Sequence, residues 1–145
     1  MGIIDAYENA EFRNKISVVA TLIKMSLADG VLDDNEMKII TKVARSYGII
    51  DPSDLLYIIK NYEKYSLEPT YDYDERIEQL YNLTKIIYAD GHIDRAELKL
   101  LKNAILSLGF PAKNLDTIYE KAVGLIVDDA DIDTFTQEIK KVNKI

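Results

Sequence analysis

The sequence predicts an all-α fold, and three observations lead to that prediction. Apolar residues recur at steps of three and four along most of the chain, which is the spacing of one face of a helix. Glycine, proline and aspartate interrupt these stretches where helix caps are expected. No stretch alternates between apolar and polar residues as a half-buried strand does. With 145 residues, 48% of them hydrophobic, the chain is expected to form a single domain over residues 1–145.

The first half of the chain predicts three helices. Apolar residues line one face of each of the first two, and Gly30 and Gly48 stand where helix C-termini place glycine. Asp51 followed by Pro52 reads as an N-cap and a first-turn proline, which begins a third helix. The expected helices are 11–29, 34–48 and 52–64.

The second half predicts four more helices. Gly91 and Gly109 again mark C-termini. The acidic run at 128–133 is expected to cap the last helix, and Lys140 and Lys141 suit its C-terminal end. The expected helices are 73–90, 95–109, 112–127 and 131–143, which makes about seven helices in all. Tyr65–Asp72, around Pro69, is the expected connector between halves at roughly 11–65 and 72–127.

The two halves are an internal repeat. At an offset of 61 residues and without a gap, Leu22–Gly48 matches Leu83–Gly109 at ten of 27 positions, well beyond chance for this composition. The shared core is Ala-Asp-Gly-x-(Leu/Ile)-Asp-x-x-Glu. Its acidic residues are Asp29, Asp33 and Glu36 in the first copy and Asp90, Asp94 and Glu97 in the second.

Two interpretations of this motif are open. In the first, the second aspartate of each copy caps the following helix and the glutamate completes a capping box. The first aspartate lies in the last turn of a helix, where a carboxylate faces the negative end of the helix dipole. That placement needs compensation, either from backbone N–H groups of its own turn or from a shared cation. A site made of carboxylates alone suits Ca²⁺ or Mg²⁺.

Two helical halves that each carry this motif resemble the tellurite-resistance TerB-like family, whose fold is also similar to the N-terminal region of DnaJ-like membrane co-chaperones. The resemblance covers roughly residues 10–127. It implies a compact bundle of about seven helices in two pseudo-twofold halves. It also implies a bacterial stress or tellurite-resistance context and divalent-cation binding by the six acidic residues named above.

Composition and charge exclude several classes of function. The chain carries 18 Lys and Arg against 25 Asp and Glu, a net charge of −7, so nucleic acid and anionic membranes are not expected partners. With no Cys and one His it cannot form Cys-ligated zinc or a His-rich metal site within one chain. Phosphate-binding glycine loops and nucleophile–base pairs are missing from the sequence. We therefore expect a cytoplasmic protein that is not an enzyme and does not insert into a membrane.

The leading hypothesis is an interaction module in the bacterial stress response, stabilised or switched by a divalent cation at the acidic motifs. The alternative is a metal-independent scaffold or adaptor with a tyrosine-rich surface, because tyrosines are good interface anchors. Six of the ten tyrosines lie near the connector: Tyr57, Tyr62, Tyr65, Tyr71, Tyr73 and Tyr81. By default their rings are expected to seal the joint between the halves. His92, inside the second motif, is expected to face solvent.

Overall fold

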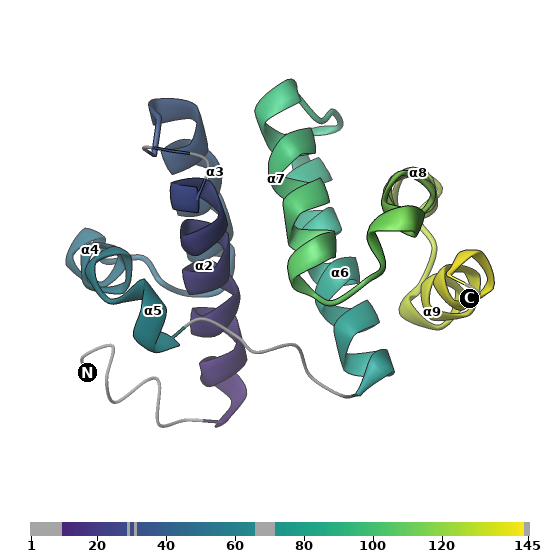
Figure 1. Ribbon diagram of the computed structural model, residues 1–145, viewed down its shortest axis with the longest axis horizontal. Coiled ribbons are helices and arrows are strands. Elements are labelled where there is room, and N and C mark those ends of the chain that lie inside the picture. The colour runs from purple at the N-terminus through teal and green to yellow at the C-terminus, as the bar shows by residue number, and fades with distance from the viewer. Residues whose placement is uncertain (1–9, 29, 31, 66–71, 144–145) are drawn as a thin grey trace. The chain divides into compact units, whose positions relative to one another are not determined.

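The computed structural model describes residues 10–28, 30, 32–65 and 72–143, and every regular element among them is a helix (Figure 1). This confirms the all-α prediction. The chain divides into a first unit, Met1–Glu68, and a second unit, Pro69–Ile145. Among the described residues no helix is both long and apolar enough to cross a membrane. The expectation of a single domain stays a prediction.

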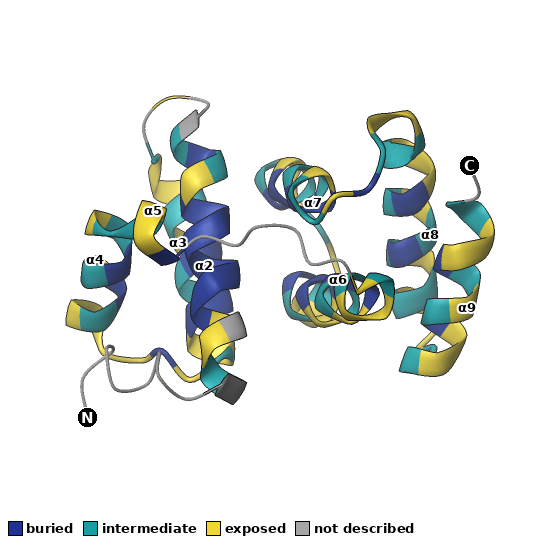
Figure 2. Ribbon diagram, turned by 60° about the horizontal axis from the view of Figure 1, so that its bottom comes forward, coloured by how far each residue is buried: buried dark blue, intermediate teal, exposed yellow. Residues whose placement is uncertain are grey.

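In the first unit, three helices pack around a central one. The helices are α2 (Ala10–Ala28), α3 (Asp34–Ser46), α4 (Pro52–Lys60) and the single-turn α5 (Tyr62–Tyr65). α2 contacts each of the others, and Figure 2 shows that much of it is buried. Residues 16–23 are buried without interruption, although the sequence pattern predicts only one buried face. The buried Thr21 hydroxyl donates a 2.8 Å hydrogen bond to the carbonyl of Ser17, so burial leaves it satisfied.

The second unit is also arranged around one helix, α6. Its elements are α6 (Tyr73–Ile87), the 3₁₀ turn η1 (Tyr88–Asp90), α7 (Arg95–Ser107), η2 (Ala112–Asn114), α8 (Leu115–Val127) and α9 (Ile132–Val142). α6 contacts α7, α8 and α9. A polar chain ties its first turn to the end of α9: Asn143 donates to the Tyr73 hydroxyl at 2.6 Å and accepts from Asn114 at 2.7 Å. Hydrogen bonds therefore hold α9 in place in addition to its packing on α6.

The repeat predicted from sequence is visible in the helix boundaries. The helices α3 and α7 begin and end at equivalent residues, 61 positions apart, and each has an aspartate N-cap. Each also ends in the same glycine turn: the N–H of Ile49 reaches the Ala44 carbonyl at 2.9 Å, and that of Phe110 reaches Ile105 at 3.3 Å. Gly48 and Gly109 adopt φ of 89° and 92°, a left-handed conformation that this Schellman turn requires.

Three predicted helices differ in detail. The helix expected at 52–64 is broken at Asn61, whose side chain donates to the Tyr57 carbonyl at 2.9 Å and so ends α4. The last turn of the helix expected at 73–90 and the first turn of the one expected at 112–127 are 3₁₀ rather than α. Most of the predicted connector, residues 66–71, lies outside the described residues.

Candidate functional site

The acidic motifs form the helix caps that the first interpretation predicts. In the first copy, Asp33 Oδ1 accepts the Glu36 N–H at 2.7 Å, and Glu36 Oε1 accepts the Asp33 N–H at 3.4 Å. In the second copy the same two hydrogen bonds join Asp94 and Glu97 at 2.8 and 3.2 Å. Both capping boxes are therefore confirmed. Each brings together two of the three candidate ligands of its own copy.

The first aspartate of each motif is the part that caps do not explain. Asp29 lies outside the described residues. Asp90 is exposed at the end of η1, directly before Gly91 with its φ of 86°. Within the described ranges, no group of three or more His, Asp or Glu side chains is placed to hold a metal ion. Cation binding by the six acidic residues stays a prediction, which a titration has to test.

His92 is exposed in the loop before α7, as predicted. Two of the ring contacts among the described residues involve tyrosines near the connector. Tyr65 is buried and stacks at a tilt on Tyr57, with ring centroids 6.1 Å apart. In the second unit the Tyr81 ring meets Phe135 edge-on at 5.1 Å. These rings strengthen packing inside each unit; Tyr71 lies outside the described residues.

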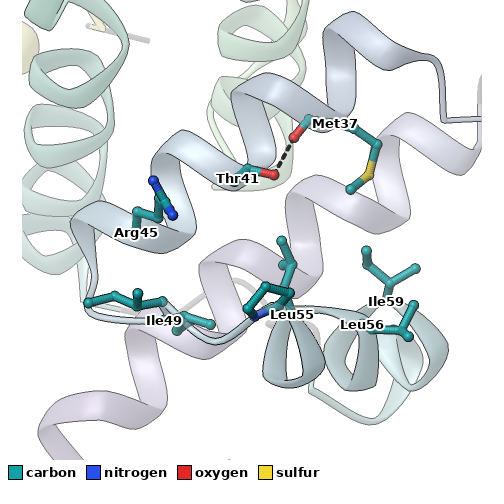
Figure 3. Close-up of a pocket in the computed structure, with 9 residues that line it drawn as sticks. Met37, Thr41, Arg45, Ile49, Leu55, Leu56 and Ile59 are labelled. Atoms are coloured by element: carbon teal, nitrogen blue, oxygen red, sulfur yellow. Dashed lines mark hydrogen bonds between the residues drawn. The ribbon is translucent and has the colours of Figure 1, made fainter.

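An apolar groove lies between α3 and α4 in the first unit. It has a volume of about 330 Å³. Figure 3 shows Arg45 and Ile49 at one end and Met37 and Ile59 at the other, with Leu55 between them. Because α3 and α4 do not pack closely on each other, although both contact α2, the space between them stays open.

The wall that α3 contributes to this groove is less polar than its sequence suggests. The Thr41 hydroxyl donates a 2.7 Å hydrogen bond to the carbonyl of Met37, four residues earlier (Figure 3). Its polar group is therefore satisfied within the helix. Thr41 and Arg45 are the two polar residues in the lining, and the other lining residues are apolar.

Two large apolar side chains at this groove are exposed to water. Ile50 is 66% exposed and Leu56 is 50% exposed. Among the described residues four large apolar side chains are exposed, so half of them border one groove. Single exposed apolar residues are ordinary, but several around one concave surface indicate a binding site.

The equivalent helices of the second unit are spaced differently. There α7 and α8 pack directly on each other. Lys102, the repeat equivalent of Thr41, lies 2.9 Å from Asp116 on α8 and 5.3 Å from the centre of the Tyr119 ring. Among the described residues α7 and α8 thus contact each other where α3 and α4 stand apart, so the repeated motif does not determine the spacing of these helices.

Sequence reasoning missed this groove, although one signal was present. Four of the nine residues of α4 are large and aliphatic, at positions 55, 56, 58 and 59. These four residues are spread around more of the helix than one buried face can cover. Only Leu55 and Ile58 of the four are buried. The excess at Leu56 was a sequence signal for a second apolar surface.

Comparisons with known proteins identify no family for this chain. The chain matches no family model, no curated protein and no solved structure. The resemblance to the TerB-like family therefore remains an expectation that depends on the repeated motif.

Proposed function

We propose that the protein is a non-enzymatic interaction module that binds a segment of another protein in the groove between α3 and α4. The observation that carries the proposal is the open apolar groove bordered by Ile50 and Leu56. Covering it would remove two exposed aliphatic side chains from water, at roughly 25 cal/mol for each Å² buried. The groove offers binding area but few reactive groups, since Thr41 is bonded to its own helix.

The biological setting of this module is proposed on two further grounds. The resemblance to the TerB-like family implies a bacterial stress or tellurite-resistance role, and the sequence predicts a cytoplasmic location. A divalent cation at the acidic motifs would stabilise the helices around the groove, because Asp33 caps the start of α3. That coupling is a separate hypothesis with its own test.

Site-specific photocrosslinking in cells of the natural source tests the interaction proposal. Benzoylphenylalanine replaces Leu56 in one version and Leu106 in another; Leu106 is 39% exposed on α7 and serves as the matched control. We expect a crosslink to one other protein from position 56, absent from position 106 and lost when Ile50→Asp is added. Equal products from both positions would overturn the proposal. A product of twice the chain's own mass would identify a second copy as occupant and also overturn it.

A further inference from the structure

We infer that the occupant of the groove is an amphipathic α-helix that lies along it for about two turns and carries an acidic residue for Arg45. This inference rests on the proposed function and deepens it, because it states the kind of partner that the groove fits. Three properties of the groove support it: the spacing of its walls, its length, and the charge at one end.

The spacing of the walls favours a helix. On α3 the lining residues Met37, Thr41 and Arg45 are four apart, and on α4 Leu55 and Ile59 are also four apart. Rows of this spacing form the ridges between which the side chains of another helix pack. The described residues contain no strand whose edge could pair with an extended peptide. An extended segment would lay unpaired backbone N–H and C=O groups on apolar side chains, whereas a helix satisfies its own.

The length of the groove sets the size of the helix. Arg45 lies eight positions after Met37 on the α3 wall, a rise of about 12 Å at 1.5 Å per residue. This is roughly two turns of a partner helix lying along it. Such a helix presents anchors at positions i, i+3, i+4 and i+7, as in other helix-in-groove complexes.

The charge at one end of the groove determines which polar residue the partner helix should carry. Arg45 is exposed in the last turn of α3, at the end of the groove where Ile49 lies (Figure 3). No acidic residue is among the side chains that line the groove in the described part of the chain. A guanidinium beside an apolar surface pairs best with a carboxylate, which it can hold by two hydrogen bonds. An acidic residue at one end of the apolar stripe therefore complements this groove, and a basic one is repelled.

A displayed peptide library tests the inference. Its 16-residue members have apolar residues at i, i+3, i+4 and i+7, with every other position randomised, and are selected on the intact protein. We expect the selected peptides to carry Asp or Glu at one fixed position beside the apolar stripe. Synthetic copies should bind Arg45→Glu at least tenfold more weakly and Lys38→Glu within twofold of the wild type. Lys38 is the matched control, an exposed cation on α3 outside the groove.

Two further variants of the selected peptides separate the possible outcomes. A Glu→Lys exchange in the peptide should restore binding to Arg45→Glu, and a central proline should abolish binding to the wild type because it breaks the helix. Peptides without an acidic preference, or with undiminished affinity after the proline change, would overturn the inference. So would a library that yields no binder. In each of these cases a specific crosslink at position 56 would leave the proposed function standing, and its absence would overturn that function as well.

Discussion

Aspartate is the N-cap of five of the eight α-helices in the described part of the chain. N-cap aspartates whose side chains accept backbone N–H groups are Asp33, Asp51, Asp72, Asp94 and Asp131. A carboxylate at this position satisfies a helix donor that has no partner in the helix and also meets the positive end of the helix dipole. An acidic chain with a net charge of −7 can therefore place part of its excess charge where it stabilises the fold.

The cap geometry makes a prediction about the acidic motifs. Asp94→Ala should lower the free energy of unfolding by about 1 kcal/mol, because α7 loses its N-cap. The loss should be the same in EDTA and in millimolar Ca²⁺ or Mg²⁺, as measured by thermal unfolding.

Cation binding by the motifs would give a different result. A cation that binds the folded protein raises its stability by about 2.7 kcal/mol at a hundredfold excess over Kd. A rise of this kind that disappears in an Asp29→Asn/Asp90→Asn double variant would contradict the cap-only expectation and identify both aspartates as ligands.

The same caps predict how stability depends on pH. Hydrogen bonds from the N–H and hydroxyl of Ser53 hold the pKa of Asp51 below its ordinary value, and bonds from Thr134 do the same for Asp131. The unfolded chain then takes up protons at a higher pH than the folded chain. The contribution of these two carboxylates to stability is thus fully present above about pH 4 and is lost as the pH drops through their lowered pKa values.

Urea unfolding between pH 7 and pH 2.5 measures this dependence. Asn at positions 51 and 131 keeps an acceptor for the helix but does not titrate, so the Asp51→Asn/Asp131→Asn variant should lose less stability in acid. If the two proteins lost stability in parallel, these carboxylates would not be the source of the acid sensitivity.

At the scale of the helix, α8 differs from α3 and α7 in how it ends. All three close with a Schellman turn; in α8 the N–H of Ala130 reaches the Leu125 carbonyl at 2.9 Å. The left-handed position, held by glycine in α3 and α7, is occupied here by Asp129 with φ of 58°. Aspartate tolerates this conformation better than most residues, but glycine does so without steric cost.

Asp129→Gly should therefore stabilise the protein, by roughly 0.5–1 kcal/mol. Asp128→Gly is the control, because Asp128 has an ordinary φ of −83° and glycine there only adds freedom to the unfolded chain. Chemical denaturation of the two variants should move the midpoint in opposite directions. A loss of stability in Asp129→Gly would mean that the aspartate side chain stabilises the turn beyond its conformational cost.

The elements that sequence predicts well are those with their own local signals. Asp33 and Asp94 fix the starts of α3 and α7, and Gly48 and Gly109 fix their ends, so both helices lie within two residues of their predicted bounds. The break at Asn61 escaped prediction because its cause is a side-chain bond to the Tyr57 carbonyl, and the apolar pattern continues past it.

The groove could not be predicted in the same way, since it depends on the space between two helices. Cap signals locate α3 and α4 along the chain but do not determine how closely they approach. In the repeated half, α7 and α8 pack directly and Lys102 reaches Asp116. In the described residues the same repeat thus leaves α3 and α4 apart in the first unit and brings α7 and α8 into contact in the second, a difference set by tertiary packing.

At the scale of the whole molecule, each unit has buried residues and a central helix of its own. In the first unit α2 is the centre, and Ile23 and Ile40 are fully buried. In the second it is α6, and Ile77 and Ile105 are fully buried. Whether such units unfold together, as the predicted single domain requires, depends on how far the loss of one core weakens the other.

Removing core volume from one unit at a time tests this cooperativity. Ile40→Ala and Ile105→Ala each delete a fully buried side chain and should cost about 2–5 kcal/mol. Because each core lies around its own central helix, we expect calorimetry to resolve two transitions, with Ile40→Ala lowering one and Ile105→Ala the other. A single transition that both variants lower equally would instead show one cooperative domain. In that case a partner bound in the groove of the first unit would stabilise the second unit as well, because both would unfold in one step.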